Sequence, residues 1–387
     1  MATPWTTASV ADCLTPVPAA GKTKLQVRDY KPAGRFPVID QGQERIAGWT
    51  DNESAVIKEP LPLIVFGDHT RAFKFIDEPF ARGADGTQLL KPKPGIDPLF
   101  FFYACKAIDL PARGYNRHFT MLKEQPLSYP DETEQKAVGS VLRRVDFALE
   151  QQSVLLRNAQ ALNQAAMREL FTSGLRGEPQ KETDNGLVPE SWTPTPCEKI
   201  FKLTSGKTRP NDVQPFQSAE KSYPVLGGNG VMGYSASWNV DAPDIMVIGR
   251  VGEYCGAVHL ASGKVWITDN ALYTREWLST EANPGFVRKF LEHYDLNRFK
   301  RMAGQPLVTQ GMINEHSVPL PNPGEQDEIV TILDALDRKI DLHLHKRAVL
   351  DDLFKALLRK LMTGEIAIDE LDLSALDRTP APEGASA

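Results

Sequence analysis

The chain has 387 residues, enough for two or three domains that each bury a core. No run approaches 18 uncharged apolar residues, and the N-terminal sequence MATPWTTASV lacks the basic and apolar regions of a signal peptide. We therefore expect a cytoplasmic protein without a membrane partner. The net charge of −6 disfavours nucleic-acid binding by the whole surface but allows a local basic face.

Residues 1–130 are predicted to form an α+β domain. Leu63–Phe66 is a short apolar run between turn residues, which is typical of a buried strand. A helix is expected near Leu99–Ala107. The many prolines and glycines of this domain favour loop-rich surfaces, on which functional residues are commonly carried.

Residues 131–176 are predicted to form one long helix. Its apolar residues recur at alternating spacings of three and four, and no proline or glycine interrupts the pattern between Leu142 and Leu170. This is the seam of a coiled coil, with Leu142, Leu149 and Leu156 among its members. Gln152 and Asn163 fall on the same seam, where polar side chains commonly fix the register of paired helices.

The segment Ser173–Glu190 is polar and rich in helix breakers, which marks a linker. Residues 177–320 are then predicted to form a second α+β domain. Strands are expected at Ile245–Ile248 and Val265–Thr268, and a helix near Phe286–His293.

Residues 321–364 are predicted to form a second long helix with the same spacing of apolar residues. Its seam includes Leu333, Ile340, Leu350 and Leu357. His343 and Arg347 are polar seam positions. Residues 365–387 are expected to be disordered.

The second half of the chain repeats the first. The two long helical segments align without a gap at an offset of 191 residues, and the offset drifts to 182 within the domains. The matching pairs include Glu134-Gln135 with Glu325-Gln326, Trp5-Thr6 with Trp192-Thr193, Leu63–Asp68 with Ile245–Arg250, and Asp85-Gly86 with Asp269-Asn270. Because they occur in the same order over the whole chain, the matches indicate a duplication.

The short linker constrains how the two helices pair. The second domain must begin near the end of the first helix and deliver the chain to the start of the second. Parallel helices would require it to bridge about 57 Å, the length of roughly 38 helical residues. The sequence therefore predicts two tandem α+β domains with pseudo-two-fold symmetry, separated by two long antiparallel coiled-coil helices. Such a spacer suits a DNA target with two half-sites one to two helical turns apart.

Several segments carry a resemblance to a known family. Pro319–Ile366 contains Pro-Leu-Pro, Glu-Gln, the long helix and Leu-Met-Thr-Gly in that order. With Tyr223–Gly230, Val247–Gly252 and Thr268–Asn270, it resembles the specificity subunits of type I restriction–modification systems. In the first half, Pro126–Pro130 departs from the family's proline-rich segment. The resemblance implies target recognition domains at 1–130 and 177–320 and spacer helices at 131–176 and 321–364.

The same resemblance implies a non-catalytic subunit that serves DNA methylation and phage defence. It would bind a bipartite site in double-stranded DNA, with each domain reading one half-site. The implied partners are two modification (methyltransferase) subunits and restriction (helicase-nuclease) subunits. No cofactor is expected in this chain, and S-adenosylmethionine is expected on the modification subunit.

The residues predicted to contact DNA lie mainly in loops beside short strands. Arg250 would favour guanine, and Asp68, at the matching place, would favour cytosine. The Gly21-Lys22-Thr23 and Gly206-Lys207-Thr208 loops suit phosphate contacts, although neither is a P-loop, which needs an earlier glycine. The complete set is Lys22, Lys24, Asp68, Arg71, Gln88, Arg117, Lys207, Arg209, Asn229, Arg250, Asn270 and Gln305. For each, a surface residue without such a role is the alternative.

Two basic clusters precede the long helices at equivalent places. One comprises Arg113, Arg117 and His118, and the other comprises Arg288, Lys289, Arg298, Lys300 and Arg301. Either they contact phosphates or they are solvated helix faces.

Patterns of catalytic and metal-binding residues are missing from the sequence. The four cysteines are far apart and never form CxxC, which argues for reduced thiols and against a zinc site. HExxH, GxSxG and the adenine methyltransferase motif Asn-Pro-Pro-Tyr/Phe are also absent. No catalytic or metal site is therefore expected. The alternative to DNA recognition is a coiled-coil scaffold whose duplicated domains bind proteins or small ligands.

Overall fold

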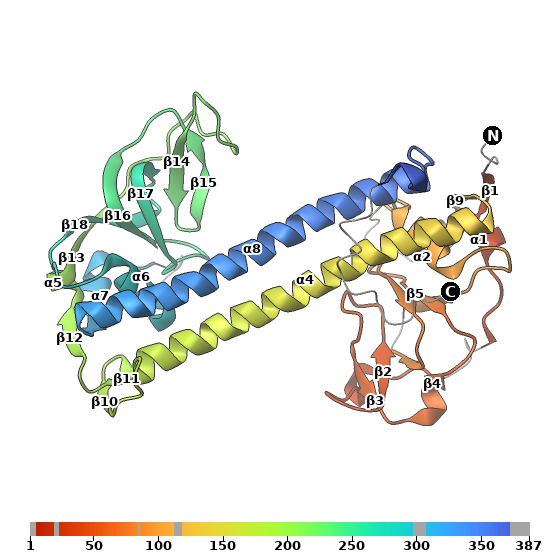
Figure 1. Cartoon of the computed structure of the whole chain (residues 1–387), viewed down its shortest axis with the longest axis horizontal. Coiled ribbons are helices and arrows are strands. Elements are labelled where there is room, and N and C mark those ends of the chain that lie inside the picture. Colours follow the sequence, from red (N-terminus) through yellow and green to blue (C-terminus); the bar gives the residue numbers. More distant parts are fainter. Residues whose placement is uncertain (1–4, 19–22, 84–85, 112–117, 297–306, 372–387) are drawn as a thin grey trace. The chain divides into compact units, whose positions relative to one another are not determined.

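The computed structural model describes residues 5–18, 23–83, 86–111, 118–296 and 307–371 (Figure 1). The chain divides into two compact units, residues 1–154 with 344–387, and residues 155–343. Two long helices, α4 (Glu132–Ser173) and α8 (Pro323–Met362), contribute to both units. The predicted α+β class with two domains and two long helices is confirmed.

The described part of the first unit contains three small sheets. In the first, β1 (Thr6–Ser9) pairs antiparallel with β9 (Pro126–Tyr129). The four-stranded sheet has the order β3 (Gly48–Thr50), β2 (Phe36–Ile39), β7 (Phe80–Arg82) and β4 (Val56–Ile57). The three-stranded sheet has the order β6 (Phe73–Ile76), β5 (Leu63–Gly67) and β8 (Thr87–Leu90). The helices are α1 (Val10–Cys13), α2 (Pro98–Ala107) and α3 (His118–Glu124), with 3-10 turns at Val27–Asp29, Glu53–Ala55 and Ile368–Glu370.

The second unit is built around one larger sheet. Its six strands have the order β13 (Phe201–Ser205), β18 (Ala271–Trp277), β16 (Val240–Gly249), β17 (Val258–Ile267), β14 (Tyr223–Gly227) and β15 (Gly230–Ser235). A separate pair joins β12 (Thr193–Pro196) to β19 (Ser317–Leu320). The helices are α5 (Cys197–Ile200), α6 (Pro284–Tyr294) and α7 (Gln310–Asn314), of which α6 packs on β16 and β17 (Figure 1).

The segment expected to be a linker contains a hairpin. Strands β10 (Gln180–Thr183) and β11 (Gly186–Pro189) pair antiparallel around a two-residue turn. Gly186 has a φ of 91°, which a glycine adopts without steric cost. The expected linker is therefore ordered, because its turn residues close a strand pair.

The duplication is visible in the strand pairing of the two units. A parallel pair joins β2 to β7 in the first unit and β14 to β17 in the second. The pairs β1–β9 and β12–β19 also correspond, each linking the start of a domain to the strand before its long helix. Both units therefore retain the pattern of one ancestral domain.

Each unit shows the direction in which the long helices pair. In the first unit, Val138 and Val145 near the start of α4 share a buried cluster with Leu361 near the end of α8. In the second, Phe171 near the end of α4 shares a cluster with Ile329 near the start of α8. The backbone N–H of Leu175 also lies 3.3 Å from Oε1 of Glu325. The predicted antiparallel pairing is thus confirmed in both units.

The predicted seam residues lie inside the helix pair or at its edge. Leu142, Leu156, Leu333 and Leu357 are buried, while Leu149, Ile340 and Leu350 are partly buried. His343 is also buried. Arg347 is exposed, so its assignment to the seam is wrong. Its long charged side chain keeps its hydration at the surface.

Candidate nucleic-acid interface

Four loops of the second domain meet beside the six-stranded sheet. They follow β13, β14, β16 and β17. The pair Leu226↔Ile267 aligns the ends of β14 and β17, and the pair Gly249↔Ala271 places the end of β16 beside the start of β18. Backbone hydrogen bonds continue into the loops. The N–H of Arg250 donates to the carbonyl of Asn270 at 2.9 Å, and the N–H of Asp269 donates to the carbonyl of Lys207 at 2.9 Å. Residues far apart in the sequence therefore form one surface.

The Gly206-Lys207-Thr208 loop lies against the turn at residues 268–270. A Cβ atom on Gly206 would lie 2.2 Å from the carbonyl oxygen of Thr268, so this close approach requires glycine. The N–H of Lys207 donates to the carbonyl of Ile267 at 2.9 Å. Lys207 and Arg209 are both exposed, as a phosphate contact requires.

Arg250 is only partly available to a ligand. Its Nη1 lies 3.3 Å from Oγ of Ser205, and its carbonyl accepts from the N–H of Val308 at 2.9 Å. Its Nε is buried and has no hydrogen-bond partner in the described part of the chain. Base reading by Arg250 stays a prediction.

Asn229 and Asn270 line the same hollow, of about 390 Å³. The turn between β14 and β15 forms one wall, and Met232 and Tyr254 also line the hollow. Both asparagines are exposed, and Met232 and Tyr254 are 42% and 47% exposed. The sequence placed the two asparagines in similar loops, and the sheet brings them together.

The matching loops of the first domain are arranged differently. Asp68 is buried, and its carboxylate accepts a 2.7 Å hydrogen bond from the N–H of Phe119. His118, which the sequence placed in a basic cluster, is also buried, with Nδ1 2.8 Å from the carbonyl oxygen of Asp68. Helix α3 thus covers the end of β5 and gives Asp68 an internal role that a sequence pattern does not reveal.

The other described residues of the first domain that were predicted to contact DNA are exposed or partly buried. Arg71 is exposed, has a φ of 61°, and donates from Nη1 to the carbonyl of Leu110 at 2.6 Å. With Lys106 it lines a second hollow of about 420 Å³. Lys24 and Gln88 are partly buried. Lys22, Arg117 and Gln305 lie outside the described residues, as do Arg113, Arg298, Lys300 and Arg301.

Comparison with known proteins finds a match in the second half of the chain. Residues 189–351 match the family model described as the type I restriction modification DNA specificity domain. This part of the chain is similar to that family. The matched segment includes the four loops, Asn229 and Asn270.

Two relatives extend the resemblance. The type I restriction enzyme EcoprrI specificity subunit of Escherichia coli is 30% identical over 140 residues, which are 36% of this chain and 34% of that protein. The chain thus aligns with about a third of that relative. The crystal structure of a type I restriction–modification S subunit from M. genitalium has a TM-score of 0.71 at 19% identity, covering 92% of this chain and 96% of that one. The resemblance drawn from the sequence is confirmed, and the structural similarity shows the fold.

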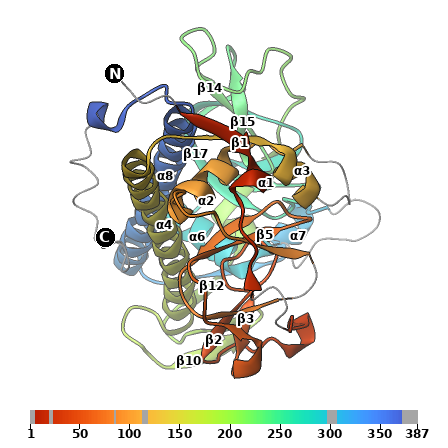
Figure 2. The same ribbon diagram turned by 90° about the vertical axis from the view of Figure 1, so that its right-hand side faces the viewer.

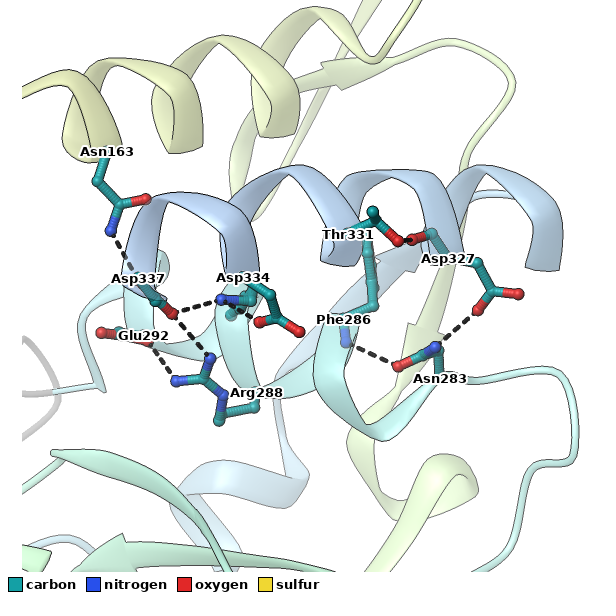
Figure 3. Close-up of polar contacts among 10 residues, drawn as sticks. Asn163, Asn283, Phe286, Arg288, Glu292, Asp327, Thr331, Asp334 and Asp337 are labelled. Atoms are coloured by element: carbon teal, nitrogen blue, oxygen red, sulfur yellow. Dashed lines mark hydrogen bonds and ion pairs between the residues drawn. The ribbon is translucent and has the colours of Figure 1, made fainter. Parts of the chain in front are cut away.

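Two residues of the basic cluster before α8, Arg288 and Lys289, form ion pairs with the helix. Lys289 is 1% exposed at its side chain, and its Nζ lies 2.7 Å from Asp337 and 2.9 Å from Asp334. Arg288 pairs with Glu292 at 3.0 Å and with Asp337 at 3.5 Å (Figure 3). Neither expected alternative, phosphate contact or a solvated face, is right for Lys289, because α6 packs this residue against acidic groups of α8.

An equivalent contact exists in the first domain. The hydroxyl of Tyr103 on α2 donates to Asp146 on α4 at 3.1 Å, and Lys106 lies 3.5 Å from the same carboxylate. Asp146 and Asp337 are matched at the offset of 191 residues. Figure 2 shows α2 beside α4. Burial raises the pKa of Tyr103, which keeps its hydroxyl protonated as a donor.

Within the five described ranges, no three His, Cys, Asp or Glu side chains gather as a metal site would require. None of the described helices combines the length and apolar character needed to cross a membrane.

Proposed function

We propose that this chain is the DNA-recognition subunit of a type I restriction–modification enzyme, and that each domain reads one half of a bipartite site in double-stranded DNA. The observation that carries the proposal is the loop surface within a matched specificity domain, where Lys207, Arg209, Asn229 and Asn270 are exposed together. Cations suit phosphates and carboxamides suit base edges, so one surface offers both kinds of contact.

The two domains would read different half-sites. Their strand pairing corresponds, but the loop residues differ, as at Asp68 and Arg250. Asp68 is buried whereas Arg250 is partly exposed, so the two surfaces offer different groups to DNA. An asymmetric target follows from this difference.

The long helices would set the distance between the half-sites and bind the partner subunits. Both expose apolar side chains, which a partner can cover. These are Val154, Leu155 and Leu162 on α4, and Ile332, Leu342, Leu344, Val349 and Leu353 on α8. The proposed partners are two modification subunits, which would hold S-adenosylmethionine and carry out methylation, and restriction subunits. The chain itself would be non-catalytic.

The net charge of −6 supports a role within an assembly. A chain with this charge would bind DNA weakly alone, and modification subunits around the duplex would add phosphate contacts. DNA affinity should therefore rise, and depend more steeply on salt, when modification subunits are added.

A domain exchange tests the proposal. Residues 1–130 are replaced by the corresponding domain of a specificity subunit with a different target, and methylated sites are mapped by sequencing. One half-site should change while the other half and the spacer persist. A change in both halves, or a chain that directs no sequence-specific methylation, contradicts the proposal.

A further inference from the structure

The hollow beside Asn229 and Asn270 has uncharged walls. Its lining consists of these two asparagines, the glycines of the turn at residues 227–230, and Val231, Met232, Val251 and Tyr254. Neither carboxamide has a hydrogen bond to the part of the chain that the structure describes. Both amides are therefore available to a ligand.

The chemistry of this lining selects among base pairs. A carboxamide offers one donor and one acceptor, which match N7 and the N6 amino group of adenine in the major groove. Guanine is usually read by Arg or Lys, and cytosine by Asp or Glu, and neither kind of group lines this hollow. Met232 and Tyr254 supply apolar surface of the kind that contacts the thymine methyl group.

Hydrogen bonds and close backbone contacts hold the loops that line the hollow. Nε2 of His259 lies 3.2 Å from the carbonyl oxygen of Gly228. A Cβ on Gly228 would lie 3.3 Å from the Cα of Gly249, so the two loops are in close contact. The carbonyl of Asn270 accepts the N–H of Arg250 at 2.9 Å. Fixed backbones present both carboxamides without a large ordering cost on binding.

We infer that this hollow reads an adenine–thymine pair in the half-site of the second domain, with Asn229 and Asn270 at the adenine edge and Met232 and Tyr254 at the thymine methyl group. The inference rests on the proposed function and names the base pair that this surface selects. Lys207 and Arg209 would hold the adjacent phosphates and fix the register of the hollow on the duplex.

The test uses the full chain in complex with modification subunits. Its target is first selected from randomised duplexes. Each adenine of the second half-site is then replaced by 7-deazaadenine and each thymine by uracil, and affinities are measured at fixed salt. One adenine and its paired thymine should each lose affinity, with a loss of about tenfold at the adenine. In whichever of Asn270→Ala and Asn229→Ala removes the donor to N7, the same analogue should cost much less, since the contact is already missing.

Asn211→Ala is the matched control, because Asn211 is an exposed loop asparagine of the same domain outside the hollow. It should keep the full response to the analogues. Asn270→Asp removes a donor and should shift the preference at that position towards cytosine. If both alanine variants respond to every analogue as the wild type does, the inference is wrong while the proposed function stands. A wild-type complex that selects no bipartite sequence refutes the proposed function itself.

Discussion

Lys289 of α6 places its Nζ 2.7 Å from a carboxylate oxygen of Asp337 on α8, with the lysine side chain 1% exposed. The other oxygen of Asp337 accepts a 3.0 Å hydrogen bond from Nδ2 of Asn163 on α4 (Figure 3). One carboxylate thus ties the second domain and both long helices together. Because Asn163 and Asp337 pair only in one alignment of the helices, the contact also specifies their register.

Replacing Lys289 by Met should destabilise the second unit. The change leaves Asp334 and Asp337 without their buried cation. Losing one partner of a fully buried pair costs about 3–5 kcal/mol, and we expect about 2–3 kcal/mol because the carboxylates are 42% and 37% exposed. Urea unfolding of the purified chain measures the change.

Two further variants are compared with Lys289→Met. Lys202→Met removes an ion pair whose side chains are 59% and 55% exposed, and should change the stability by less than about 0.5 kcal/mol. Lys289→Tyr copies the Tyr103–Asp146 contact of the first unit and should retain more stability than the Met variant. Equal loss in the Lys202 and Lys289 variants would show that burial of the cation has no special role.

Gln326→Ala should loosen α6 from α8. The Oε1 of Gln326 accepts from the N–H of Asn283 at 2.7 Å, and its Nε2 donates to the carbonyls of Pro321 and Glu281, both at 2.9 Å. Gln326 is fully buried, so its removal leaves unsatisfied backbone groups at a cost of about 2 kcal/mol. Hydrogen exchange should become faster in α6.

The matching residue of the first repeat provides a paired experiment. Gln135 accepts from the N–H of Asp97 at 2.8 Å and donates to the carbonyl of Pro130 at 2.9 Å. Gln135→Ala should therefore speed exchange in α2. Gln160→Ala, at an exposed position of α4, is the control and should change neither helix. Unchanged exchange in both glutamine variants would count against this role.

The thiol of Cys197 should be unreactive in the folded protein. Burial raises its pKa to about 12, from an ordinary value of 9.0. A raised folded pKa means that folding favours the protonated thiol, so this contribution to stability is present below pH 9 and is lost as the pH rises towards 12.

Labelling with a thiol reagent at pH 8 tests this. The described structure buries all four cysteines without disulfides, so we expect slow labelling in buffer and four rapid equivalents in denaturant. Cys197→Ala should flatten the fall in stability between pH 9 and pH 10. Rapid labelling of Cys197 in the folded chain would contradict its burial.

A length change in the helices tests their proposed role as a spacer. Inserting about four residues, one helical turn, at the same level of α4 and α8 lengthens both by about 6 Å and rotates the seam by only about 40° beyond a full turn. The spacer between the half-sites should lengthen while both half-sites persist. Mapping of methylated sites in cells with the complete system measures this, and an unchanged spacer excludes the role.

The sequence by itself determined the duplication, the two long helices and their antiparallel direction. Helix formation depends on residues a few positions apart. The spacing of the apolar residues and the absence of proline and glycine between Leu142 and Leu170 can therefore be read from the sequence alone. Because the linker between the first helix and the second domain is short, the sequence favoured antiparallel pairing of the two helices. The helices expected at Leu99–Ala107 and Phe286–His293 are present for the same reason.

Only the tertiary structure decided which charged residues are buried and which loop residues meet. From the sequence, Lys289 resembles a surface cation, but in the structure α6 packs it against α8. Asp68 likewise resembles a loop carboxylate in the sequence, but in the structure α3 covers it. Asn229 and Asn270 share a hollow because parallel pairing of β14 with β17 aligns the ends of strands distant in the sequence. Burial and proximity depend on residues far along the chain, whereas helix formation depends on residues a few positions away.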